Sequence, residues 1–254
     1  YQSDLARMIL GDTLHPGGLA LTNHLGRLMG LQRDDWVVDL ASGRGSSALA
    51  VSRVFHCQVL GVEFGRASAI EAREASLASP ASPRAYFVQG DAESPPLQSA
   101  RFDAVFSECS LSLFPNKLAA LREAARLLRP GGFLGLSDVT VEPGSLPPEL
   151  DNSLGQMLCL CDALSVTGYQ ELIGEAGLHL THSEDASGEV LKLLEELAGK
   201  LGAFLAWQEL TGKGAESNQL RQAPELIDRV RDLVESGRLG YWLFAAQKPI
   251  SENA

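Results

Sequence analysis

Residues 37–45 read Val-Val-Asp-Leu-Ala-Ser-Gly-Arg-Gly, and they join an apolar strand-like run to a helix-like stretch at 46–55. The two glycines matter because a side chain at these positions would keep a ligand away from the backbone. The first turn of the following helix adds N–H groups that have no partner within the helix. This stretch therefore predicts an α/β unit with a ligand-binding loop after its first strand.

The alternation of strand and helix continues along the chain. The sequence predicts strands at 36–40, 58–62, 85–88, 102–107, 133–137, 178–182 and 241–247, and helices at 46–55, 67–77, 117–128 and 167–176. In 117–128 apolar residues recur at helical spacing, and Arg-Pro-Gly-Gly at 129–132 follows as a stop signal. Such alternation builds parallel strands with helices on both faces, so the fold class is α/β with a doubly wound, mostly parallel sheet.

Two helical additions flank this core. A helix at 17–29 precedes the first strand, and a long helical insert at 187–236, broken around 212–214, separates the last two strands. We expect a single domain over 1–254, with an N-terminal helical cap (1–30), a cofactor-binding core (31–186), the insert (187–236), and the last strand and tail (237–254). Both additions are expected at the carboxyl edge of the strands, where open α/β sheets bind ligands.

Composition excludes several classes of protein. The chain has 254 residues, 45% of them hydrophobic, and carries 32 acidic against 21 basic residues, a net charge of −11. An acidic chain is a poor nucleic-acid binder. No apolar run reaches the roughly 18 residues of a membrane span, and the first ten residues lack a signal-peptide pattern. Four cysteines do not make a disulfide framework, so we expect a cytoplasmic protein. We further expect a monomer or homodimer that acts on a small molecule and holds no metal.

An acid follows the second strand. Glu63 stands twenty residues after Gly43, with Phe64 beside it. A carboxylate at this position accepts hydrogen bonds from the two hydroxyls of a ribose, which indicates an adenosine-containing ligand. Because Gly43-x-Gly45-x-x-Ala48 also fits the dinucleotide fingerprint, a nicotinamide-dependent oxidoreductase stays open at this point.

Three further motifs stand in order after the loop. They read Gln-Gly-Asp-Ala-Glu at 89–93, Phe-Asp-Ala-Val at 102–105 and Leu-Leu-Arg-Pro-Gly-Gly at 127–132. With the glycine loop, they resemble the class I S-adenosylmethionine-dependent methyltransferases over residues 36–138. The glycine motif of that family is acid-x-Gly-x-Gly-x-Gly, and here Ala41 replaces the first glycine, a change we expect to be tolerated.

The resemblance implies S-adenosyl-L-methionine as cofactor and a seven-stranded sheet whose last strand is antiparallel. It also implies which residues bind the cofactor. The loop would line the methionine part, Glu63 and Phe64 the ribose side, a second acidic turn the adenine, and the end of the fourth strand the sulfonium and the substrate. The residues concerned are Asp39, Ala41, Ser42, Gly43, Gly45, Glu63, Phe64, Asp91, Ala92, Ser107 and Glu108.

Methyl transfer from a sulfonium is an in-line displacement, so the protein mainly positions the nucleophile and excludes water. A thiolate needs little further help, whereas a hydroxyl or amine needs a base. The candidate bases are Glu108, Asp138 and His15, the last in a Pro-Gly-Gly loop before the N-terminal helix.

The cysteines suggest a particular branch. Ser107-Glu108-Cys109 with Pro-Asn-Lys at 115–117, and Cys-Leu-Cys-Asp-Ala-Leu at 159–164, resemble the arsenite methyltransferases. That resemblance implies a metalloid-binding role for Cys159, with Cys109 and Cys161 at the same substrate edge, and thiolates suit soft ions. The match is incomplete, because only Cys57, an expected core residue, stands near the first family cysteine and none follows Cys161.

The sequence therefore predicts S-adenosylmethionine-dependent methyl transfer to a small soft nucleophile, such as a thiol-bound metalloid, a thiol or sulfide. The alternative is a methyltransferase acting on a carbon, oxygen or nitrogen of a small organic metabolite, since the same fold serves many substrates. Two readings from other classes stay open: the oxidoreductase, and a non-catalytic protein that has kept the cofactor pocket.

Overall fold

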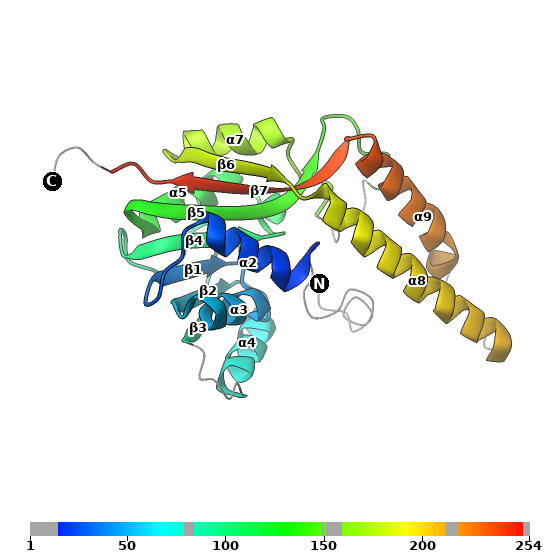
Figure 1. Cartoon of the computed structure of the whole chain (residues 1–254), viewed down its shortest axis with the longest axis horizontal. Helices are drawn as coiled ribbons and strands as arrows, with labels where there is room; N and C mark the ends of the chain where they lie inside the picture. Colours follow the sequence, from blue (N-terminus) through cyan, green and yellow to red (C-terminus); the bar gives the residue numbers. More distant parts are fainter. Residues whose placement is uncertain (1–14, 79–83, 149, 151–158, 212–217, 251–254) are drawn as a thin grey trace.

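A seven-stranded sheet of order β3-β2-β1-β4-β5-β7-β6 forms the centre of the molecule (Figure 1). The computed structural model describes residues 15–78, 84–148, 150, 159–211 and 218–250. The strands are β1 (Trp36–Leu40), β2 (Gln58–Glu63), β3 (Ala85–Gln89), β4 (Phe102–Glu108), β5 (Leu128–Val141), β6 (His179–Asp185) and β7 (Leu239–Gln247). Strands β1 to β5 pair in parallel, and β7 runs antiparallel to both β5 and β6. The predicted fold class is confirmed, including the antiparallel last strand.

Helices cover both faces of the sheet. On one face lie α2 (Gly18–Leu28), α3 (Ser46–Phe55) and α4 (Arg66–Ala78); on the other lie α5 (Lys117–Leu127) and α7 (Val166–Glu175). Each face has its own apolar cluster. Leu25 of α2 and Val51 of α3 are fully shielded on the first face, as are Leu121 of α5 and Ile173 of α7 on the second. Each predicted helix is present to within about a residue at either end.

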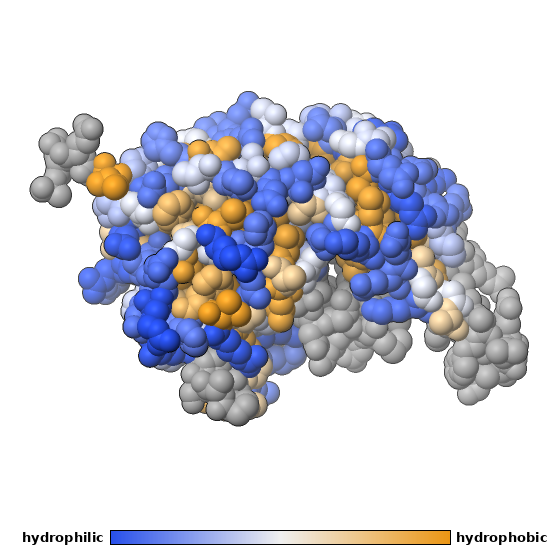
Figure 2. All heavy atoms as spheres, in the orientation of Figure 1, coloured by the Kyte–Doolittle hydropathy of each residue, from blue (hydrophilic) through white to orange (hydrophobic). Residues whose placement is uncertain are grey.

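Helices α8 (Ser187–Thr211) and α9 (Asn218–Glu235) form the insert between β6 and β7 and project together from one end of the sheet (Figure 1). The break expected around 212–214 lies outside the described residues. Apolar side chains of the pair pack against the ends of β5 and β7, for example Val190 and Val230 beside Tyr241. In Figure 2 hydrophilic residues cover much of the pair, and apolar residues gather where it joins the sheet. No helix in the described ranges is long and apolar enough to cross a membrane.

The start of β5 differs from the prediction. The strand begins at Leu128, which pairs with Phe102, and not at residue 133. Helix α5 ends at Leu127, as the stop signal in the Arg-Pro-Gly-Gly run at 129–132 predicts, and the chain passes from there directly into the strand. Lys248, just after β7, holds this run: Gly131 N–H donates to its carbonyl at 2.9 Å, and its own N–H donates to Gly132 O at 2.9 Å. These two hydrogen bonds with Lys248 thus keep Gly131 and Gly132 in the strand, although proline and glycine disfavour a strand locally.

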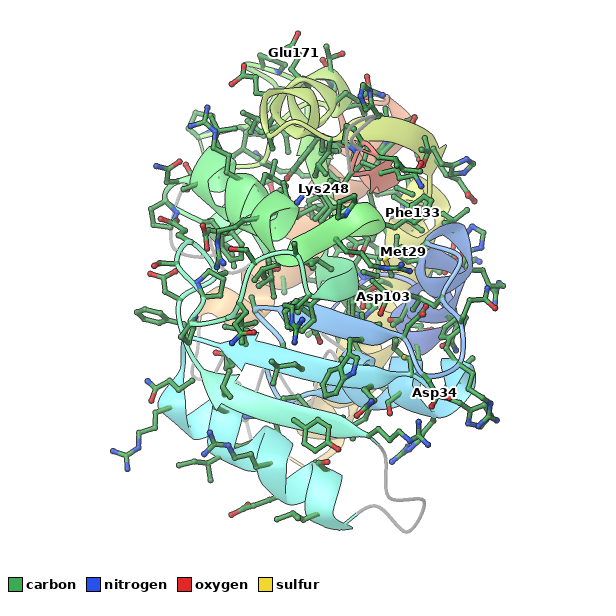
Figure 3. All side chains as sticks on the ribbon, turned by 90° about the vertical axis from the view of Figure 1, so that its left-hand side faces the viewer. Met29, Asp34, Asp103, Phe133, Glu171 and Lys248 are labelled. Atoms are coloured by element: carbon green, nitrogen blue, oxygen red, sulfur yellow. The ribbon has the colours of Figure 1, made fainter. Side chains whose placement is uncertain are left out.

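The amino-terminal edge of the parallel strands faces the viewer in Figure 3, where Asp103 and Lys248 are labelled. Asp103 accepts a hydrogen bond from Trp36 N at 2.7 Å and pairs with Arg129 Nε at 2.6 Å. The Lys248 ammonium donates to the carbonyls of Ala125 and Leu128, both at 2.7 Å, near the end of α5. Charged groups at this edge serve to tie strands and helix ends together, whereas the candidate functional residues lie at the carboxyl edge.

Candidate active site

The glycine loop between β1 and α3 is built from left-handed backbone. Gly43 and Gly45 have φ of +54° and +81°, and Ala41 has φ of +61°. Two hydrogen bonds hold the loop: Ser42 N donates to Val62 O at 3.1 Å, and Gly45 N to Ser42 O at 2.8 Å. A residue with a Cβ pays a steric cost in this conformation, so Ala41 is accommodated with strain at a position where the family has glycine.

Glu63 closes the loop from the end of β2. One carboxylate oxygen accepts the Gly43 N–H at 2.8 Å and the other the Gly65 N–H at 2.7 Å. Each oxygen keeps a second lone pair, which can accept a ribose hydroxyl. The space beside the loop is open, because a Cβ on Gly43 would meet no atom within 4 Å. Phe64 stands 75% exposed next to Glu63, so its ring is available to a flat ligand.

Acidic side chains lie around this space. Asp39 of β1 is 3% exposed, and burial raises its pKa well above the usual range, helped by the charges of Glu108 and Glu63. Among the described side chains, its Oδ2 atom and the Ser42 hydroxyl are buried without a hydrogen-bond partner. The carboxylates of Glu63 and Glu108, whose charges both reach Asp39, suit a cation such as a sulfonium and oppose an anionic pyrophosphate. The residues present therefore fit S-adenosylmethionine better than a dinucleotide.

The second acidic turn follows β3 and joins the same edge. Gly90 N donates to Glu63 O at 3.0 Å, which sets the turn beside the glycine loop. Asp91 accepts the Glu93 N–H at 2.9 Å through one oxygen, and Ala92 is buried. The turn lies where the resemblance expects the adenine, and its role there is a prediction.

Glu108, at the end of β4, meets His15 and Thr22 of the N-terminal helix region. The Thr22 hydroxyl donates to Glu108 Oε2 at 2.9 Å, and His15 Nε2 lies 3.6 Å from the same oxygen and 3.4 Å from Thr22 Oγ1. The side chains of His15 and Glu108 are 6% and 4% exposed. Two of the predicted catalytic residues are thus brought together, although they stand far apart in the sequence.

The contacts of His15 fix its neutral tautomer. Its Nδ1 atom lies 3.1 Å from the Pro16 carbonyl oxygen. Because a carbonyl only accepts, Nδ1 carries the proton, and we assign the lone pair of the neutral ring to Nε2. The Nε2 atom lies beside Glu108 and Thr22. A proton taken up at Nε2 would gain a carboxylate and a hydroxyl oxygen as neighbours, which is the environment of a general base.

Asp138, a third predicted base, lies apart from this pair. Its oxygens accept the Ser112 N–H and hydroxyl, both at 2.9 Å, and its own neighbour Val139 N–H at 2.8 Å. Burial raises its pKa to about 6, against the opposing effect of these hydrogen bonds. The carboxylate holds the short helix η1 (Leu111–Leu113) onto β5, so its task in the structure is architectural.

Ser107 also has a structural contact. Its hydroxyl is buried and donates to Leu40 O at 3.0 Å, which ties β4 to β1 directly behind the glycine loop. The expectation that Ser107 and Glu108 face the sulfonium and the substrate stays a prediction.

The cysteines divide into a pair and two others. Cys109 and Cys159 have their sulfur atoms 3.6 Å apart, and both have left-handed backbone, with φ of +49° and +64°. Cys161 lies with its sulfur 3.6 Å from Leu150 O, in a segment that is turned and not extended. Cys57 is a buried core residue, and burial raises its pKa to about 12.

Sequence reasoning missed the residues that hold Glu108. Besides Thr22, these are Ser137, whose hydroxyl donates to Glu108 Oε1 at 3.3 Å, and Tyr241, whose hydroxyl donates to Ser137 Oγ at 3.0 Å. Each stands in an apolar stretch that predicts only core. No local pattern could have linked residues of α2, β5 and β7 to one carboxylate.

Comparison with known proteins agrees with this geometry. Residues 38–136, which run from β1 through the glycine loop to β5, match the protein-family model described as "Methyltransferase domain". The chain is an S-adenosylmethionine-dependent methyltransferase. The methyltransferase core thus spans the loop, both acidic turns and Glu108, and S-adenosylmethionine is the cosubstrate.

Two curated proteins are similar to this chain over most of its length. The 27-O-demethylrifamycin SV methyltransferase of Amycolatopsis mediterranei is 26% identical over 263 aligned residues, covering 97% of this chain and 94% of the relative. The (+)-O-methylkolavelool synthase of Herpetosiphon aurantiacus is 25% identical, covering 74% of this chain and 71% of the relative. Neither name refers to a metalloid.

Solved structures of enzymes with different activities share the fold. A phosphoethanolamine N-methyltransferase 2 of Haemonchus contortus, solved with S-adenosyl-L-methionine, superposes with a TM-score of 0.77 at 19% identity, over 96% of this chain and 56% of that one. The [4+2]-cyclase SpnF gives a TM-score of 0.71 at 22% identity, over 92% and 81%. A cyclase among them shows that this fold does not by itself determine the reaction.

Proposed function

We propose that this methyltransferase methylates a hydroxyl oxygen of a small organic molecule. The observation that carries the proposal is the buried contact between His15 and Glu108 at the edge where the glycine loop opens. A hydroxyl is a poor nucleophile until a base takes its proton. A histidine with a buried carboxylate beside it suits this task because the carboxylate stabilises the imidazolium that forms, whereas a thiolate acceptor would not require such a base.

The chain's residues act as follows. S-adenosylmethionine, when bound, supplies an electrophilic methyl group on a sulfonium. His15 Nε2 takes the proton of the acceptor hydroxyl while the oxygen forms its bond to the methyl carbon, and the electrons of the broken S–C bond go to the leaving sulfur. Glu108 stabilises the imidazolium, and Thr22 holds Glu108 in place through its 2.9 Å hydrogen bond.

The relatives support an oxygen acceptor. The two named above carry O-methyl products or O-demethyl substrates in their names, and the first aligns with 97% of this chain. This support favours the organic-metabolite alternative over the soft nucleophile that the cysteines first suggested.

Methyl transfer from deuterium-labelled S-adenosylmethionine tests the proposal. Acceptors would be 27-O-demethylrifamycin SV, a terpenoid alcohol and simple phenols, with products located by mass spectrometry. We expect a labelled O-methyl product whose rate falls about 100-fold or more in His15→Gln. His24→Gln is the matched control, because His24, on α2, also pairs with an acid, Glu184, at 2.8 Å, but at a partly exposed position on the surface. Full activity of His15→Gln would contradict the proposal.

A second candidate rests on the contact between Cys109 and Cys159. Two sulfur atoms 3.6 Å apart could bind a trivalent metalloid as a thiolate pair, which is the soft-nucleophile alternative. Arsenite offered with glutathione tests it. A methylated arsenic product that Cys159→Ser abolishes, with cofactor binding intact, would favour this candidate; its absence, together with hydroxyl methylation by Cys159→Ser, would exclude it.

A further inference from the structure

A chain of three hydroxyl and carboxyl groups crosses the sheet beneath the His15–Glu108 pair. Tyr241 of β7 donates to Ser137 of β5 at 3.0 Å, and Ser137 donates to Glu108 Oε1 at 3.3 Å. Tyr241 and Ser137 are both 0% exposed. Thr22 takes the other oxygen, Oε2, at 2.9 Å. The carboxylate is therefore held by one donor on each oxygen, so Oε2 points toward His15.

Each hydroxyl in this series of hydrogen bonds donates in one direction, toward Glu108. Burial raises the pKa of Tyr241 well above the usual range, so its hydroxyl keeps its proton and donates. Ser137 Oγ accepts the hydrogen bond from Tyr241, so its own hydroxyl proton is directed to the Glu108 carboxylate. Aligned donors of this kind strengthen one another in a buried setting. The result is a fixed charge aimed at Nε2 of His15.

We propose that Tyr241 is a positioning residue for the catalytic pair, acting through Ser137 to hold the Glu108 carboxylate against His15. Its catalytic consequence rests on the proposed function, since the oriented carboxylate matters because it stabilises the proton that His15 takes from an acceptor hydroxyl. Tyr241 itself touches neither the acceptor nor the cofactor in this role.

The other charges near this carboxylate come from several elements. Asp39 of β1 feels the charge of Glu108, and Tyr241 feels those of Glu108, Cys109 and Asp138. Glu63 of β2 acts on Asp39 in turn. His15 is the basic side chain that the structure places against Glu108. The other groups named here are acidic or neutral. A change in the titration midpoint of His15 after removal of the Tyr241 hydroxyl would therefore report on the Glu108 carboxylate.

The test is a pH titration of the histidine rings by NMR in the full chain, without an acceptor. The chain has five histidines, and His15→Gln assigns the His15 signal. In Tyr241→Phe the carboxylate is freed to turn from His15, which loses stabilisation of its protonated form. We expect the His15 midpoint to move to lower pH by about 0.3 to 1 unit, and further in Glu108→Gln. Ser137→Ala breaks the same chain and should give the same direction, so a poorly folded Tyr241 variant would leave the test intact.

Tyr169→Phe is the matched control. Tyr169 is also 0% exposed, but its hydroxyl donates to Val139 O at 3.1 Å and not toward Glu108. We expect its loss to leave the His15 midpoint unchanged. With an accepted hydroxyl substrate, Tyr241→Phe should lower kcat about 3- to 10-fold, with KM and cofactor affinity unchanged.

A midpoint in Tyr241→Phe and Ser137→Ala equal to that of Tyr169→Phe would overturn the proposal and leave Tyr241 as a core residue. The failure of the proposed function gives a different result: no hydroxyl acceptor is methylated by the wild-type chain, while the titration still shows whether the hydroxyl chain holds Glu108.

Discussion

The two glycines of the loop should respond differently to the same substitution. Both have left-handed backbone, with φ of +54° at Gly43 and +81° at Gly45. A Cβ on Gly45 would lie 2.4 Å from Cζ of Phe87 and 3.2 Å from Cβ of Ala72, whereas a Cβ on Gly43 would meet no atom within 4 Å. Alanine thus adds only backbone strain at Gly43, but strain and a clash at Gly45.

The magnitudes follow from these two terms. Left-handed backbone costs an alanine about 1 to 2 kcal/mol, and alanine recovers about 0.5 kcal/mol of that through a less flexible unfolded chain. Forcing a methyl group against the Phe87 ring adds about 1 to 3 kcal/mol. The backbone terms are similar at both sites, so Gly45→Ala should be less stable than Gly43→Ala by about 1 to 3 kcal/mol.

Urea unfolding and calorimetric titration with S-adenosylmethionine measure the two effects separately. Gly43→Ala should lose only about 0.5 to 1.5 kcal/mol of stability but bind the cofactor about 10-fold more weakly or worse, because its methyl group enters the open space beside Glu63. Wild-type affinity in a folded Gly43→Ala protein would refute the assignment of that space to the cofactor. Equal losses of stability in both variants would refute the steric argument.

Three further substitutions test other parts of the site. Glu63→Ala should weaken S-adenosylmethionine binding about 10- to 100-fold by calorimetry, since it removes a ribose acceptor and the anchor of the loop; unchanged affinity would exclude that role. Ala41→Gly should raise the free energy of unfolding by about 0.5 to 1 kcal/mol, because it relieves the φ of +61°; a less stable variant would mean that Ala41 is unstrained. Asp138 has a pKa raised to about 6 in the folded chain, so the folded state holds this proton more tightly than the unfolded one. Its contribution to stability is therefore present at low pH and is lost as the pH rises through about 6, by up to about 3 kcal/mol. Asp138→Asn should remove that part of the pH dependence in urea unfolding at pH 4.5 and 7, and an unchanged slope would contradict the burial argument.

Local patterns were enough to predict most of the sheet. The strand at 36–40 and the helix at 46–55 have the predicted bounds, because apolar runs and helical spacing follow from the residues themselves. The glycine loop and Glu63 could be placed at one edge for the same reason, since the carboxyl ends of neighbouring parallel strands meet there. The prediction failed at the start of β5, where Lys248, far along the chain, pairs with a Pro-Gly-Gly run.

The surroundings of Glu108 could not be predicted. Thr22 lies 86 residues away from it, and Ser137 and Tyr241 lie 104 residues from each other. Tyr241 stands in an apolar strand, where its ring satisfies the pattern of a core residue and its hydroxyl adds no periodic signal. The contact between Cys109 and Cys159 likewise depends on two left-handed residues in separate turns. Long-range polar contacts of this kind are set by the folded sheet.

Calorimetric titration of the purified chain with S-adenosylmethionine and its demethylated product, with NADH as the control, tests most directly whether the glycine loop and its acids form the methyl-donor site. We predict micromolar binding of the first two ligands at one site per chain, and no binding of NADH. Binding of NADH, or no binding of either methionine-derived ligand, would contradict the assignment of Glu63, Asp39 and the glycine loop to this cofactor.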